Sequence, residues 1–116
     1  MLKNLQTKNR NLWNNMKFGL NDKTLTSIRN VINHYENIDL AIIYGSRAKG
    51  NYRNGSDIDI TLKGIDLKLK DILSLENEID ELMLPYKFDI SIYEHIDNKD
   101  FLDHIDRVGK VFFIRD

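Results

Sequence analysis

Three aspartates carry the clearest chemical signal in the sequence. Asp57 and Asp59 stand two residues apart in an alternating segment, DIDITL, and Asp89 stands in a second one, FDISIY. Successive residues of a β-strand point to opposite faces, so each segment predicts a strand with its aspartates on the polar face. If the two strands are neighbours, the carboxylates converge. Two of them at about 4 Å repel by roughly 1 to 4 kcal/mol, so such a cluster calls for a cation.

A divalent cation also fits the chemistry that these residue types support. Magnesium prefers carboxylate oxygens together with substrate phosphates. Two such ions can stabilise the attacking and the leaving oxygen of an in-line phosphoryl displacement. The aspartates therefore predict a magnesium site for phosphoryl or nucleotidyl transfer.

A second cluster precedes the aspartate pair, where an apolar run at residues 40–44 ends in Gly45 and Ser46. Glycine lets the backbone approach a phosphate, and free N–H groups at the start of a helix attract an anion. Ser46 can add a hydroxyl, and Arg47 or Lys49 a positive charge. These residues predict a turn that binds phosphate.

The segment between the two clusters, residues 50–56, contains Asn54-Gly55, a turn signal that would return the chain antiparallel. The phosphate-binding turn and the carboxylates then meet at one end of a hairpin. Two residues keep two interpretations each. Arg47 and Ser56 either contact phosphate or order the loop, and for Ser56 the second role is that of capping the turn.

The stretch from Gly45-Ser46 to Asp57-x-Asp59 resembles the nucleotidyltransferase signature of the DNA polymerase beta superfamily. The resemblance extends from about residue 18 to the C-terminus, and the chain is similar to the short, stand-alone minimal nucleotidyltransferases of bacteria and archaea. It implies that Asp57 and Asp59 bind two magnesium ions. It also implies that Asp89 binds the catalytic ion and helps to deprotonate the attacking hydroxyl, and that Gly45 and Ser46 hold the triphosphate.

The resemblance also implies a function. A nucleoside monophosphate, AMP from ATP, would be transferred to a hydroxyl, and a small helical protein of the HEPN type would supply the acceptor, as in two-component toxin–antitoxin systems. Larger relatives bind the acceptor with an extra helical domain, for which this chain has no room. Two alternatives stay open. One is an enzyme that modifies a small molecule such as an aminoglycoside, and the other is a catalytically silent nucleotide-binding module.

The elements that must position these residues follow from hydrophobic spacing. The pattern predicts an α/β fold in the mixed sense, a small twisted mixed sheet with helices packed on it. Residues 18–116 form this domain, and residues 1–17 form a helical extension that either docks on the domain or covers a partner. Asn21 or Asp22 caps the first helix of the domain, and Asp97 caps the last one. Strands are expected at 40–44, 57–62, 88–93 and 111–114, and helices at about 22–35, 67–83 and 97–108.

The composition limits the classes of function. The chain has 116 residues, 41% hydrophobic and 30% charged, which suits one globular domain. Its 17 Lys and Arg balance 18 Asp and Glu, so neither long nucleic acid nor a membrane is an expected partner, while homo- or hetero-oligomers stay open. With no cysteine and no signal peptide, we expect a cytoplasmic protein. The histidines, His34, His95 and His104, lack metal-ligand spacing and are expected at the surface without a role.

Overall fold

The structure is a computed structural model that describes residues 17–116. The predicted N-terminal helix therefore lies, apart from its last residue, outside the described residues. Four α-helices, one 3-10 helix and four strands make up the described part. The helices are α2 (Asp22–Asn33), α3 (Gly45–Lys49), α4 (Leu69–Asp80), α5 (Lys99–Val108) and the 3-10 helix η1 (Tyr93–His95), and the strands are β1 (Ile38–Tyr44), β2 (Ile58–Gly64), β3 (Phe88–Ile92) and β4 (Lys110–Ile114).

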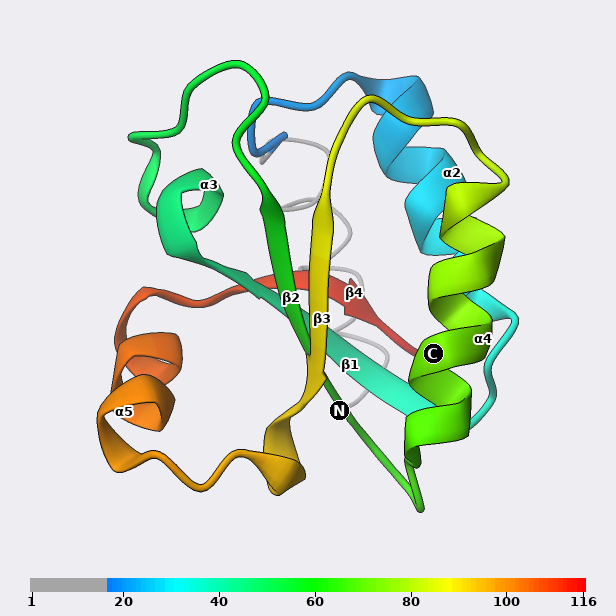
Figure 1. The fold of residues 1–116 in the computed structure, drawn as a ribbon, viewed down its shortest axis with the longest axis vertical. Helices are drawn as coiled ribbons and strands as arrows, with labels where there is room; N and C mark the ends of the chain where they lie inside the picture. The colour runs from blue at the N-terminus through cyan, green and yellow to red at the C-terminus, as the bar shows by residue number, and fades with distance from the viewer. Residues whose placement is uncertain (1–16) are drawn as a thin grey trace.

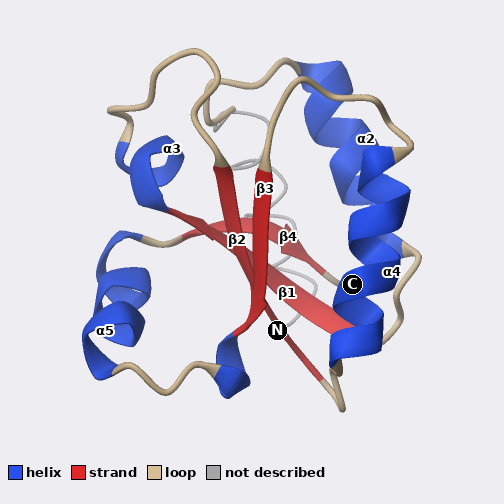
Figure 2. Cartoon of the chain, in the orientation of Figure 1, coloured by secondary structure: helices blue, strands red, loops and turns tan. Residues whose placement is uncertain are grey.

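The strands form one sheet in the order β3-β2-β1-β4 (Figures 1 and 2). β1 lies inside the sheet and pairs antiparallel with β2 and with β4. β2 pairs parallel with β3, which the chain reaches through the crossover helix α4. The predicted small mixed sheet is therefore confirmed.

The helices divide between the two sides of the sheet. α2 and α4 lie side by side on one side, and α3 and α5 lie on the other (Figure 1). The side chains that α2 and α4 bury are mainly apolar and recur at helical spacing, so each of these two helices turns one apolar stripe to the sheet. They include Leu25, Ile28, Val31 and Ile32 of α2 and Ile72, Leu75 and Ile79 of α4.

The helix ends show which capping predictions hold. The side chain of Asn21 accepts a hydrogen bond from the backbone N–H of Thr24 at 2.8 Å and caps α2, as expected. The prediction for α5 is wrong by one residue. Asn98, not Asp97, is its cap, because the Asn98 side chain accepts from the N–H of Phe101 at 3.0 Å. Both residue types can cap, so only the chain path chooses between them.

The core lies between the sheet and the pair α2 and α4. Ile58, Ile60 and Leu62 of β2 are fully buried there, as their alternation predicts. Phe18 and Leu20 are also buried in the core, just before α2. None of the helices within residues 17–116 combines the length and the hydrophobicity needed to cross a bilayer.

Candidate functional site

The sheet brings the predicted aspartates to one place. In the parallel pair of β2 and β3, Asp59 is the register partner of Asp89, so both side chains lie on the same face of adjacent strands. Asp57 stands one residue before β2, directly in front of Ile58. The two segments are therefore neighbouring strands, which is the condition for the carboxylates to converge, although Asp57 belongs to the loop rather than to the strand.

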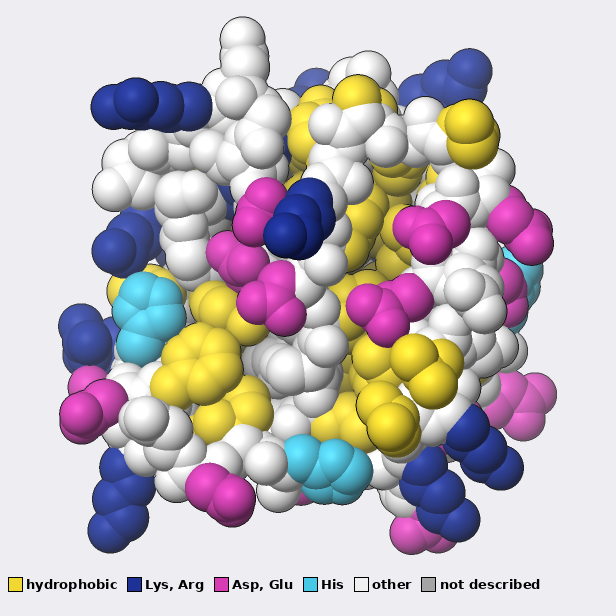
Figure 3. All heavy atoms as spheres, in the orientation of Figure 1, with side chains coloured by type: hydrophobic (Ala, Val, Ile, Leu, Met, Phe, Trp, Pro, Cys, Tyr) yellow, Lys and Arg dark blue, Asp and Glu magenta, His cyan; other side chains and the backbone are white. Residues whose placement is uncertain are grey.

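The three carboxylates influence one another electrostatically. Burial raises the pKa of Asp59 above its ordinary value, and the negative charges of Asp89 and Asp57 raise it further. Arg47 and His104 oppose this shift. Asp59 is half-buried, whereas Asp57 and Asp89 are exposed. Figure 3 shows the result as a group of acidic side chains on the face that carries β2 and β3, with one basic side chain against it.

The donor set suits a hard cation, since it consists of carboxylate oxygens that face solvent and repel one another. Within residues 17–116, no three His, Cys, Asp or Glu side chains are gathered as closely as the ligands of one metal ion. Asp59 and Asp89 stand in register on adjacent strands, and a shared cation would require the aspartate side chains to rotate toward it. Exposed carboxylates such as those of Asp57 and Asp89 are free to do so.

The glycine-serine turn stands against the same carboxylates. Tyr44, the last residue of β1, is the register partner of Asp59 in β2, and Gly45 follows it with a φ of 73°. A Cβ atom placed on Gly45 would overlap the Asp59 carboxylate. Glycine is therefore required here twice, by the left-handed backbone and by the close approach of a side chain. Ser46 is half-buried beside it, in the first turn of α3.

Arg47 and Ser56 are joined by hydrogen bonds. Nε and one Nη of Arg47 donate to the carbonyl oxygen of Ser56 at 3.0 and 2.8 Å, and the other Nη donates to the carbonyl oxygen of Phe18 at 2.9 Å. The Ser56 hydroxyl accepts from the backbone N–H of Arg53 at 2.8 Å. Of the two roles that the sequence leaves open for each residue, these contacts supply the loop-ordering one.

Two residues near the site carried no signal that we used in the sequence. Tyr44 packs edge-on against Phe101 of α5 with ring centroids 5.4 Å apart, and burial together with the charge of Asp89 raises its pKa to about 12. His104 is half-buried rather than exposed, and its ring stands 6.3 Å from the Tyr44 ring. Tyr44 could have been noted because it directly precedes Gly45. The place of His104 follows only from the packing of α5.

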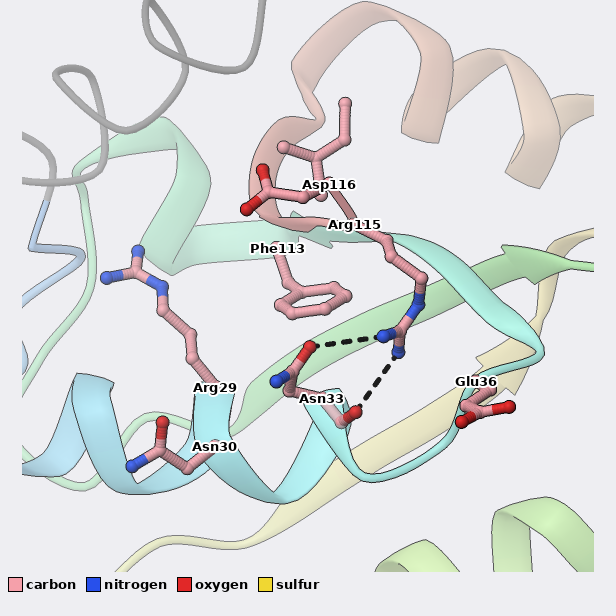
Figure 4. A pocket seen from close by; sticks show the side chains of 8 residues that line it. Arg29, Asn30, Asn33, Glu36, Phe113, Arg115 and Asp116 are labelled. Carbon is pink, nitrogen blue, oxygen red and sulfur yellow. Dashed lines mark hydrogen bonds between the residues drawn. The ribbon is translucent and has the colours of Figure 1, made fainter. Parts of the chain in front are cut away.

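A wide pocket lies elsewhere and is lined by other residues. It has a volume of about 700 Å³ between α2 and the C-terminal residues (Figure 4). Arg115 donates there to the side chain of Asn33 at 3.1 Å and to the carbonyl oxygens of Ile38 and Tyr35 at 2.8 and 2.6 Å. These bonds tie the chain end to α2 and to the start of β1. The volume of a pocket therefore does not identify the residues that can do chemistry in this protein.

The family model described as "Polymerase beta, Nucleotidyltransferase" matches residues 26–116. This match covers α3, the loop after it and all four strands, and so includes every site residue predicted from the sequence. No curated protein matches the sequence.

Several solved structures share the fold. One is a toxin–antitoxin complex with AMP-PNP, at a TM-score of 0.63 and 18% identity over 83% of this chain and 75% of the other. Another is the MntA–HepT toxin–antitoxin complex, at a TM-score of 0.61 and 14% identity over 82% of this chain and 74% of the other. A third is the tri-AMPylated HEPN toxin of Shewanella oneidensis in complex with its MNT antitoxin, at a TM-score of 0.59 and 15% identity over 79% of this chain and 71% of the other. At these identities the likeness concerns the fold.

Proposed function

The chain belongs to the polymerase beta nucleotidyltransferase family, and from this premise we propose that it transfers AMP from ATP to a hydroxyl of a small helical partner protein of the HEPN type. In this proposal it is the antitoxin half of a toxin–antitoxin pair. The observation that carries the proposal is the contact between the Gly45 turn and the Asp59 carboxylate, beside Asp89. A phosphate-binding backbone and an acidic cluster at one strand end suit nucleotidyl transfer.

Gly45 and Ser46 hold the triphosphate in this proposal. Without a side chain, Gly45 leaves the backbone open to a phosphate group, and the Ser46 hydroxyl adds a donor. The reaction joins the hydroxyl oxygen of the acceptor to the α-phosphorus and breaks its bond to the bridging oxygen, so that pyrophosphate leaves.

Asp57, Asp59 and Asp89 would hold two magnesium ions, which neutralise the developing charge on the phosphate oxygens. The chain itself contributes the placement of these carboxylates. Asp59 is fixed by β2, between β1 and β3. Asp89 lies on β3, the strand at the edge of the sheet, and its exposed carboxylate takes up the proton of the attacking hydroxyl.

The acceptor is proposed to come from another protein because the site is open. Asp57 and Asp89 are exposed, and acidic side chains on the face that carries β2 and β3 lie at the surface (Figure 3). Much of the rate of such a transfer comes from holding the nucleophile in line, which an open face does poorly. The AMPylated HEPN toxin in one of the structurally similar complexes supports a protein hydroxyl as the acceptor.

The test is to incubate the purified protein with labelled ATP, magnesium and the helical protein encoded beside it, and to measure the mass of each protein. We expect one or more AMP groups on the partner, and none when Asp57→Asn replaces the wild type. Asp39→Asn, at an exposed aspartate at the far end of β1, is the matched control and should leave the transfer unchanged. Labelling of an aminoglycoside instead, or a tight complex without any labelling, would overturn the proposal in favour of one of the two alternatives.

A further inference from the structure

We propose that Arg47 is a positioning residue that sets the direction of the Asp57 carboxylate through the peptide bond between Ser56 and Asp57. The inference deepens the proposed function and rests on it, because it concerns the same site. It assigns to Arg47 a task other than binding the triphosphate.

The first step is the place of Asp57 in the chain. Asp57 precedes β2, so the sheet supports it on one side only, where the N–H of Ile58 donates to the carbonyl oxygen of Lys87 at 2.9 Å. On the other side runs the loop of residues 50–57, which has no regular structure beyond a turn at Asn54 and Gly55. A second anchor is needed to fix an exposed aspartate in such a place.

Arg47 supplies that anchor. Its Nε and one Nη donate to a single acceptor, the carbonyl oxygen of Ser56. This carbonyl belongs to the peptide unit whose nitrogen is that of Asp57, and the peptide unit is planar. Fixing the carbonyl oxygen therefore fixes the plane of this peptide unit. The N–H of Ile58, bound to Lys87 on the far side, fixes the next peptide plane. Together the two planes restrict φ and ψ of Asp57 and, with them, the direction of the bond from Cα to Cβ.

The surroundings of the guanidinium suit this task. Arg47 is 3% exposed, and its guanidinium carbon lies 4.9 Å from the ring centroid of Tyr86 and 5.4 Å from that of Tyr52. The Tyr52 ring in turn occupies the space that a Cβ of Gly19 would need. The remaining Nη donates to Phe18, so the segment before α2, the loop and the approach to β3 are joined through one side chain.

The same contacts leave Arg47 poorly placed to bind phosphate. All three guanidinium nitrogens donate to backbone carbonyls, two aromatic rings lie against the group, and almost none of the side chain reaches solvent. An arginine that binds a triphosphate presents its donors to the ligand. Lys49, at the end of α3, and Arg53, within the loop, are by contrast exposed and remain available to an anion.

Arg47→Met and Arg47→Lys test the proposal, with Arg107→Met, at an exposed arginine of α5, as the matched control. In Arg47→Met we expect hydrogen exchange of the amides of residues 54–58 to rise at least about tenfold, since the loop loses its anchor. kcat should fall by about 100-fold while KM for ATP changes little, because a misplaced ligand affects the chemical step. The magnesium concentration for half-maximal activity should rise. Arg47→Lys should restore little, because an ammonium cannot replace the paired donors.

Affinity for a non-hydrolysable ATP analogue, measured by calorimetry without divalent cation, separates the two roles of Arg47. Affinity within about twofold of the wild type supports positioning, and a loss of tenfold or more with unchanged exchange would overturn it in favour of phosphate binding. Tyr52→Leu covers the case in which the Arg47 variants do not fold. It removes one ring from the guanidinium and should raise exchange in the same amides to a smaller degree; unchanged exchange counts against the proposal. If the wild-type protein transfers no AMP and Arg47→Met still raises the exchange of these amides, the positioning role is upheld and the proposed function is overturned.

Discussion

Asp57 and Asp59 belong to one short motif, yet the protein holds them in different ways. Asp59 lies inside β2, with register partners on both sides, Tyr44 in β1 and Asp89 in β3. Asp57 lies outside the strand, and its direction depends on hydrogen bonds made by Arg47 and Lys87. A residue in a sheet is fixed by many weak bonds, so the loss of one is tolerated. A residue in a loop depends on one or two contacts.

The surroundings of the two aspartates differ as well. Asp59 is half-buried and faces two other carboxylates, which together with burial raise its pKa. Asp57 is exposed, so water screens its charge. Ionised Asp59 therefore lowers the stability of the metal-free protein.

The largest effect should follow from removing either charge. Asp57→Asn and Asp59→Asn should each reduce AMP transfer by at least about 1000-fold, because a bound divalent cation contributes several kcal/mol to transition-state stabilisation. Their effects on the metal-free protein should differ. Asp59→Asn should raise the Tm, because it removes a half-buried charge and the repulsion from both neighbours, and Asp57→Asn should raise it by less, because it removes one repulsion only. Transfer assays and thermal unfolding in a chelator measure both effects, and equal Tm values for the two variants would contradict the comparison.

The next effect concerns the backbone that faces Asp59. Gly45→Ala should lower the free energy of unfolding by roughly 2 to 4 kcal/mol, through left-handed strain and the overlap with the Asp59 carboxylate. Gly50→Ala is the matched control, because Gly50 also has a positive φ, of 89°, but no atom lies within 4 Å of an added Cβ. Gly50→Ala should lower the free energy of unfolding by about 1 kcal/mol only. Denaturant unfolding gives both values, and equal losses would mean that the carboxylate moves away at no cost.

A smaller loss of stability is expected from a substitution in the two strands that carry Asp59 and Asp89. Thr61 is fully buried, and its hydroxyl accepts from that of its register partner Ser91 at 3.0 Å. Thr61→Val keeps the shape and leaves the Ser91 hydroxyl without this acceptor, which costs about 1 to 2 kcal/mol. Transfer should persist at more than about half of the wild-type rate, because the ladder still holds Asp59. If Thr61→Val lost as much activity as Arg47→Met, the strand would not hold Asp59 more firmly than the loop holds Asp57.

The smallest effect lies far from the site, where Tyr35 and His34 bond to Glu78 across α2 and α4. These bonds, that of Tyr35 first, lower the pKa of Glu78 below its ordinary value. A lowered pKa means that the ionised group stabilises the fold above that value, and that this stability is lost as the pH falls through the folded pKa. Glu78→Gln should therefore lower the Tm slightly at neutral pH and not at about pH 3, with transfer unchanged. A Tm difference between Glu78→Gln and the wild type that grows as the pH falls would contradict this prediction.

The local chemistry of the site could be predicted from the sequence because its signals are local. Alternation with a period of two places Asp57 and Asp59 opposite Ile58 and Ile60 in any strand that this segment forms. Gly45-Ser46 after an apolar run, with Asn54-Gly55 between it and the aspartates, predicts the hairpin that the structure contains. The apolar faces of α2 and α4 follow from helical spacing in the same way.

Other features depended on residues far apart in the chain. Asp89 meets Asp59 only because β3 pairs parallel with β2 after the α4 crossover, and no local pattern specifies that register. The buried bonds of Arg47 depend on where Phe18 and Ser56 come to lie. His104 approaches Tyr44 because α5 packs on that side of the sheet. Periodicity decides which face of an element a side chain occupies, whereas the packing of the whole chain decides what that face meets.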